Sequence, residues 1–124
     1  MHGRPRDYKK KLADPAAQAG YKKKASVDAI RNGTALILSC RKAKRYDDVA
    51  MDASGKLLKV VPEIYTIWNF RREALGTAFE AGGAGARAAS DGELALTAAC
   101  LAENPKSYSA WHHRKWVAAK ARLQ

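Results

Sequence analysis

Two similar segments of this 124-residue chain hold the side chains best suited to chemistry. They read PEIYTIWNFRREAL from residue 62 and NPKSYSAWHHRKW from residue 104. A shift of 43 positions aligns Pro62 with Pro105 and brings the two segments into register. The position after the proline differs, being Glu63 in the first segment and Lys106 in the second. Because the copies carry opposite charges there, we infer that the fold does not require the lysine.

Lys106 is placed where an anion would be favoured. It follows Pro105 and precedes a predicted helix, whose free N–H groups and dipole attract negative charge. Tyr108 lies two residues further on and offers a hydroxyl group. The sequence therefore indicates a cradle for a phosphate group made by Lys106 and Tyr108, with a solvated lysine at a turn as the alternative.

The other residues that could carry chemistry are less suggestive. His112 and His113 are adjacent, and adjacent residues of a helix point about 100° apart, so they do not predict a metal site. Cys40 and Cys100 are interpreted as reduced apolar residues. No glycine-rich phosphate loop, dinucleotide motif, nucleophile elbow or zinc-protease motif occurs. We expect no metal in this chain and no self-contained active site.

The duplication extends upstream of these segments and predicts the fold. Each copy indicates a first helix that starts near an Asp cap and stops before proline, followed by a second helix after the corner. Two such αα-hairpins predict an all-α solenoid, in which recurring Tyr and Trp side chains fill the seams and each Arg bonds carbonyls or a carboxylate of the next hairpin. The aligned pairs are Asp48 and Asp91, Met51 and Leu94, Ser54 and Thr97, Leu58 and Leu101, Pro62 and Pro105, Tyr65 and Tyr108, Trp68 and Trp111, Arg71 and Arg114.

Composition along the chain predicts its boundaries. Glycine and proline near the start favour an extended basic arm over residues 1–15, followed by a helical-repeat domain over 16–124. Within that domain we expect an N-terminal helix at 16–43, repeat one at about 46–80, a Gly/Ala-rich loop at 81–90, and repeat two at about 91–122.

Charge is concentrated at the start of the chain. Residues 1–45 hold 13 of the 23 Lys and Arg residues but only 3 of the 12 Asp and Glu residues. This basic segment suggests an anionic partner, and one hypothesis is nucleic acid, which predicts affinity that falls steeply with salt. The sequence has no apolar run long enough for a transmembrane helix and no secretory signal, so the cytosol is the expected location.

The two segments resemble successive repeats of the protein prenyltransferase alpha subunit, which carry a P-x-x-Y-x-x-W-x-x-R pattern. This sequence matches the pattern twice, first at Pro62, Tyr65, Trp68 and Arg71, and then at Pro105, Tyr108, Trp111 and Arg114. The opening Met-His-Gly-Arg resembles the Rab-type enzyme, geranylgeranyltransferase type II. So does Asn69, where the farnesyltransferase form tends to have His.

The resemblance implies a right-handed superhelix that wraps a separate beta subunit, which would hold the catalytic zinc and the isoprenoid pocket. It implies transfer of a geranylgeranyl group from geranylgeranyl diphosphate to cysteines of Rab proteins presented by an escort protein. Lys106 would stabilise the departing diphosphate, with Tyr108 in support. This chain would bind no cofactor itself, and nucleic acid is not expected as a partner.

The resemblance also implies that something is missing. The family has five or more repeats and this chain has two, so we expect an N-terminal or truncated part that is inactive alone. The alternative function is a non-catalytic, tetratricopeptide-like adaptor that binds proteins. Against it, the tryptophan lies in the second helix with arginine three residues later, unlike the tetratricopeptide pattern W-x-x-L-G.

Overall fold

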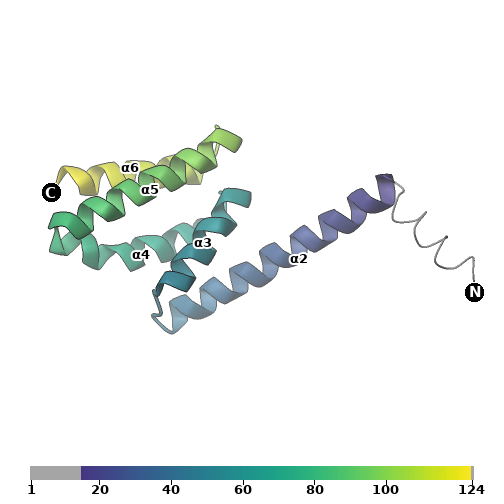
Figure 1. Ribbon diagram of the computed structural model, residues 1–124, viewed down its shortest axis with the longest axis horizontal. Helices are drawn as coiled ribbons and strands as arrows, with labels where there is room; N and C mark the ends of the chain where they lie inside the picture. Colours follow the sequence, from purple (N-terminus) through teal and green to yellow (C-terminus); the bar gives the residue numbers. More distant parts are fainter. Residues whose placement is uncertain (1–14, 124) are drawn as a thin grey trace, which may run out of the picture. The chain divides into compact units, whose positions relative to one another are not determined.

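The computed structural model describes residues 15–123, and across that range it consists of helices and contains no β-strand (Figure 1). The prediction of an all-α fold is confirmed. The helices are α2 (Pro15–Lys42), α3 (Asp48–Val60), α4 (Tyr65–Ala81), α5 (Gly83–Glu103) and α6 (Tyr108–Arg122).

The chain divides into two units, residues 1–32 and 33–124. In the first unit, the described residues form the beginning of α2. The extended arm predicted for residues 1–15 lies outside the described residues except at Pro15, where the prediction is wrong because Pro15 starts α2. Proline suits the first position of a helix, where its missing N–H group would have no partner in any case.

The N-terminal helix predicted for residues 16–43 is confirmed as α2. The Asn32-Gly33 pair does not interrupt it. In the second unit, Ile37 and Cys40 are buried whereas Leu36 and Leu38 are exposed.

Each of the two predicted hairpins is present, α3 with α4 and α5 with α6. Asp47 caps α3 by accepting a hydrogen bond from the Ala50 amide at 2.9 Å. As predicted, α3 and α5 end just before the prolines of their corners, since a residue before proline avoids the helical conformation. The second helices then begin at the paired tyrosines, Tyr65 and Tyr108.

The hairpins pack against each other through α4, α5 and α6, with α3 also packed against α5 (Figure 1). This seam holds the largest buried side chains and gives the unit one continuous core. Fully buried residues of this unit include Leu58, Ile67, Trp68, Phe70, Cys100, His113 and Val117.

The loop predicted for residues 81–90 is wrong. The chain leaves the helical conformation only at Gly82 and Gly83, whose φ angles are 69° and 72°, and α5 then runs unbroken from Gly83. Positive φ is easy for glycine, so these two residues make the turn. The remaining stretch is rich in alanine, the best helix former, and Ala86 is fully buried. Asp91 is consequently an exposed residue inside α5 and not a helix cap.

Candidate functional site

The two corners, Pro62–Ile64 and Asn104–Ser107, lie next to each other, and Glu63 joins them. Its carboxylate accepts hydrogen bonds from the hydroxyl groups of Ser107 and Ser109, and from the backbone N–H of Ser109 at 3.3 Å. The hydrogen bond from Ser107 is the main reason that the pKa of Glu63 lies below its ordinary value. Glu63 therefore acts as an anion bound at the start of α6.

This contact corrects one part of the sequence interpretation. The amide groups at the start of α6 were expected to be free to hold a phosphate group near Lys106. Instead, Glu63 binds the Ser109 amide, and the Ser107 hydroxyl accepts from the Ala110 amide at 3.2 Å. The anion position at this helix end is filled by the protein's own carboxylate. Lys106 and Tyr108 can contribute only their side chains.

Both of those side chains are available. Lys106 is exposed and Tyr108 is 80% exposed. Within the part of the chain that the structure describes, neither the Lys106 ammonium nor the Tyr108 hydroxyl has a hydrogen bond or ion pair. Tyr65, the equivalent of Tyr108, is 55% exposed as well. The prediction that the tyrosines fill the seam between hairpins is therefore wrong.

The tryptophans keep one orientation in both repeats. The Trp68 indole donates to the Pro62 carbonyl at 2.7 Å, and the Trp111 indole donates to the Pro105 carbonyl at 2.9 Å. Trp68 is fully buried, with its ring 4.4 Å from that of His113. Trp111 is 48% exposed. The seam role predicted for tryptophan is thus confirmed for Trp68 alone.

Arg71 makes the contact between hairpins that the sequence predicted. Its Nη1 atom donates to the Met51 carbonyl at 2.6 Å and to the Ser54 hydroxyl at 2.7 Å. Its other edge donates to the carboxylate of Glu93 on α5, from Nε at 3.0 Å and from Nη2 at 2.7 Å. Arg71 and Glu93 are only 7% and 3% exposed, so this is a buried, two-point ion pair across the seam.

His113 completes this cluster, although neither its role nor that of Glu93 was predicted from the sequence. Its Nε2 atom lies 2.9 Å from a Glu93 oxygen and its Nδ1 atom 3.1 Å from Arg72 Nη1. A guanidinium can only donate, so Nδ1 accepts from Arg72, and the protonated Nε2 donates a hydrogen bond to the Glu93 carboxylate. The sequence offered one signal, because Arg71 was predicted to bond carbonyls or a carboxylate of the next hairpin. Glu93 and His113 do not recur in copy one, where Ala50 and Phe70 occupy the aligned positions.

The charges of the cluster follow from its surroundings. Burial is the main cause of the lowered pKa of His113, which is therefore neutral. Burial alone would raise the pKa of Glu93, but hydrogen bonds from His113 and Arg71 outweigh it and hold that pKa below its ordinary value. The cluster thus contains one anion, Glu93, clasped by a cation and a neutral imidazole, and it stabilises the seam.

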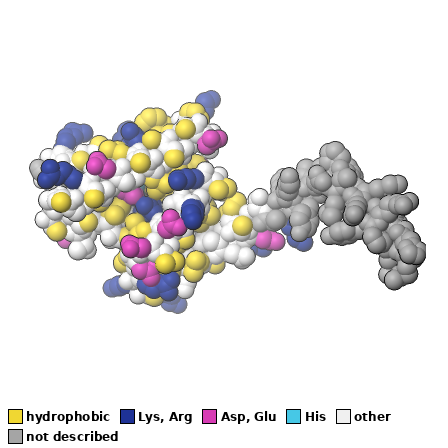
Figure 2. All heavy atoms as spheres, viewed as in Figure 1, with side chains coloured by type: hydrophobic (Ala, Val, Ile, Leu, Met, Phe, Trp, Pro, Cys, Tyr) yellow, Lys and Arg dark blue, Asp and Glu magenta, His cyan; other side chains and the backbone are white. Residues whose placement is uncertain are grey.

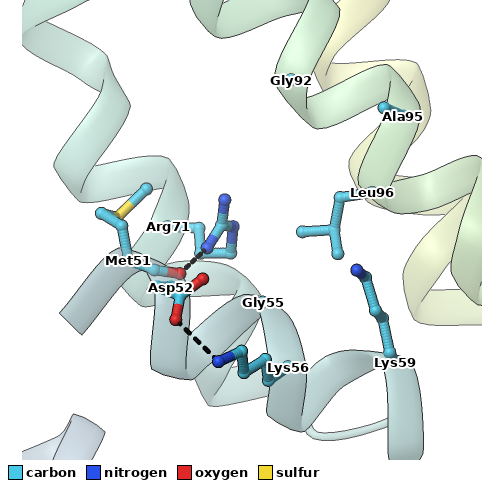
Figure 3. Close-up of a pocket in the computed structure, with 9 residues that line it drawn as sticks. All are labelled: Met51, Asp52, Gly55, Lys56, Lys59, Arg71, Gly92, Ala95 and Leu96. Carbon is cyan, nitrogen blue, oxygen red and sulfur yellow. Dashed lines mark hydrogen bonds and ion pairs between the residues drawn. The ribbon is translucent and has the colours of Figure 1, made fainter. Parts of the chain in front are cut away.

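A groove of about 460 Å³ lies between α3 and α5 (Figure 3). Lys59 of α3 projects across it toward Leu96, while Lys56 is paired with Asp52 at 3.1 Å. Arg71 borders the groove, but each of its three nitrogens already donates to a contact described above. We assign no ligand to this groove.

Within residues 15–123, no cluster of three or more His, Cys, Asp or Glu side chains is arranged to hold a metal ion. None of the helices in that range is both long and apolar enough to span a membrane. On the face in Figure 2, Lys and Arg side chains over the hairpins are interspersed with Asp and Glu.

The geometry defines the class of protein: a helical-repeat protein whose two hairpins contain equivalent internal Trp and Arg contacts. Comparison with known proteins identifies the repeat. Residues 90–121, which make up most of α5 and α6, match the family described as "Protein prenyltransferase alpha subunit repeat". The resemblance inferred from the two corners is therefore confirmed.

Named relatives align with nearly the whole chain. Geranylgeranyl transferase type-2 subunit alpha 1 of Arabidopsis thaliana is 37% identical over 97% of this chain and 17% of its own length. The alpha subunit of Rattus norvegicus is 30% identical over 97% of this chain and 21% of its own length. That of Homo sapiens is 31% identical over 94% of this chain and 20% of its own. The chain spans about a fifth of the length of these relatives.

Proposed function

We propose that this chain works as part of the alpha subunit of a type-2 protein geranylgeranyltransferase and that it is not active alone. Its relatives carry that name, and 97% of this chain aligns with each of the first two. The partner would be a beta subunit, which would hold the catalytic zinc. The donor would be geranylgeranyl diphosphate, and the acceptors cysteines of Rab proteins presented by an escort protein. The comparisons lend no support to a tetratricopeptide-like adaptor.

The proposed reaction sets the task of this chain. A cysteine thiolate attacks the first carbon of the geranylgeranyl group, a carbon–sulfur bond forms, and the carbon–oxygen bond to diphosphate breaks. Negative charge grows on the departing diphosphate, so a nearby cation lowers the barrier. We assign that role to the Lys106 ammonium, with the Tyr108 hydroxyl as a supporting hydrogen-bond donor.

The observation that carries this assignment is the difference between the aligned residues Glu63 and Lys106. In repeat one, Glu63 supplies the anion that sits at the start of the neighbouring helix α6. At the equivalent place in repeat two, Lys106 supplies a cation, and its ammonium is exposed without a partner among the described residues. Because Glu63 already fills the anion position at the start of α6, an external anion such as diphosphate would bind the exposed Lys106 ammonium itself.

The test measures inorganic diphosphate binding to the chain in complex with a beta subunit. Lys106→Ala should weaken binding about tenfold or more, because one charge-assisted contact to phosphate is lost. Tyr108→Phe should have a smaller effect. Lys115→Ala is the matched control, since it removes another exposed lysine of the same region and should leave binding unchanged. Equal binding by the Lys106→Ala and Lys115→Ala complexes would refute the role of Lys106.

A further inference from the structure

A basic run at residues 22–24 lies just before a serine that the proposed function does not use. The sequence from residue 22 reads KKKASV, so three lysines occupy the fourth, third and second positions before Ser26. Val27, which follows the serine, is 45% exposed. Protein kinases distinguish their substrates largely by the charge pattern around the acceptor, and one large class selects cations at these positions. The run therefore marks Ser26 as an acceptor for a kinase of that class.

Exposure distinguishes Ser26 from most other hydroxyl groups of the chain. Most Ser and Thr side chains are buried or half-buried, and the exposed ones are Ser26, Ser39, Thr66 and Thr77. None of the other three exposed residues has a Lys or Arg within the four positions before it. Charge and exposure therefore coincide at Ser26 alone among these four residues.

The helix around Ser26 can open at low cost. Ser26 lies within α2, and a kinase takes its acceptor in an extended conformation, so the local turn has to unwind first. None of the described side chains of α2 that precede Ile37 is buried. Opening this part of α2 therefore withdraws no side chain from the core, and a helix without tertiary packing is only marginally stable in water. Ser39, in contrast, lies between the buried residues Ile37 and Cys40.

We propose that Ser26 is a phosphorylation site for a protein kinase that selects basic sequences. The Ser26 hydroxyl oxygen attacks the γ-phosphorus of ATP, a new oxygen–phosphorus bond forms, and the bond from that phosphorus to the bridging oxygen breaks. ADP leaves, and the hydroxyl proton passes to the kinase. The phosphate adds a charge of about −2 directly after the three lysines, so it weakens the attraction of this basic segment for an anionic partner. The proposal does not rest on the proposed function.

The test incubates the full chain with magnesium ATP and the catalytic subunit of the cAMP-dependent protein kinase, which selects basic residues before serine. The rate of phosphate incorporation is measured, and mass spectrometry locates the phosphate. The chain should be phosphorylated at Ser26, and Ser26→Ala should lower the rate about tenfold or more, because the acceptor with the matching charge pattern is lost. Ser39→Ala is the matched control and should leave the rate unchanged, since Ser39 is an exposed serine of the same helix without preceding basic residues.

Two further measurements separate the basic run from the helix. Lys→Gln at all three positions of residues 22–24 should slow phosphorylation of Ser26 about tenfold or more, because the charge pattern is lost. A peptide of residues 20–31 presents the same motif without the folded chain, and the full chain should react within about tenfold of its rate, because α2 opens readily there. A chain that takes up no phosphate would overturn the proposal, whether or not the peptide reacts. Phosphate found on the half-buried Thr34, which has Arg31 three residues before it, in place of Ser26 would also overturn it.

Discussion

At the scale of single residues, the chain uses arginine and glutamate in two ways. Arg71 and Glu93 form a buried pair at the seam, where the net gain depends on both partners being present. Arg41 and Glu73 form a pair of similar geometry, but their side chains are 37% and 38% exposed. Burial, and not distance, separates these two pairs, because water screens the exposed one.

Glu93→Gln tests this difference. It should lower the free energy of unfolding by about 3 kcal/mol or more, because the Arg71 guanidinium is left buried without its counter-charge. Urea denaturation followed by circular dichroism measures the change. Glu73→Gln is the matched control and should cost less than about 1 kcal/mol. Equal costs would contradict the assignment of Glu93 as the centre of the seam.

His113 should make stability depend on pH. Its pKa is lowered in the folded chain, where it faces Glu93, Arg71 and Arg72. Below the ordinary value of 6.5, the unfolded chain takes up a proton that the folded chain does not. The free energy of unfolding should therefore decrease as pH falls through about 6.5. Glu93, whose pKa is also lowered, acts in the same direction at more acidic pH.

The measurement is the free energy of unfolding at about pH 7.5 and about pH 5.5. His113→Gln should remove most of the difference between the two values. His112→Gln is the control, because His112 is the neighbouring residue in the sequence. It should leave the difference between the two values unchanged, because His112 is exposed. A chain that becomes more stable on acidification over this range would contradict a neutral, buried His113.

At the scale of elements, much of the fold could be predicted because the repeated residues have local consequences. Proline ends the first helices, Asp47 caps α3, and the paired tyrosines start the second helices. The start of α5 was not predictable in this way. A Gly/Ala-rich stretch can form either a loop or a helix, because glycine breaks helices but also occurs in them. The buried position of Ala86 in the folded structure accompanies the helix.

Two glycines of α5 give opposite predictions. Gly85→Ala should raise the free energy of unfolding by up to about 1 kcal/mol, because Gly85 lies inside the helix with open space at its Cβ position. Gly83→Ala should lower it by about 1 kcal/mol, because φ is +72° there. Thermal unfolding of both variants measures the changes. A destabilising Gly85→Ala would mean that the Gly/Ala-rich stretch is not helical.

At the scale of the whole molecule, the sequence predicted the repeat that the family model matches but not all of the contacts that join the repeats. Trp68 and Arg71 recur in both copies and were predicted to lie at the seam. Glu93 and His113 do not recur, since their counterparts are Ala50 and Phe70. A contact between successive repeats joins residues at different positions of the repeat. Alignment of the copies compares residues at the same position, so it does not reveal such a contact.

The predicted site shows the same limit. Lys106 and Tyr108 are exposed as a binding site requires, but the role of Glu63 at the start of α6 became visible only in three dimensions. Their part in diphosphate binding, the right-handed superhelix, the zinc of a beta subunit and the cytoplasmic location remain predictions. The relatives support the enzyme class, and the chain covers about a fifth of their length.

The most direct test of the central claim is binding to a beta subunit. The full chain would be co-expressed with the beta subunit of a type-2 geranylgeranyltransferase, and the purified material analysed by sedimentation for a one-to-one complex. A tetratricopeptide hairpin protein of similar size and charge serves as the control bait. The account predicts a stable complex with this chain and none with the control. A beta subunit that binds neither protein, or both alike, would contradict it.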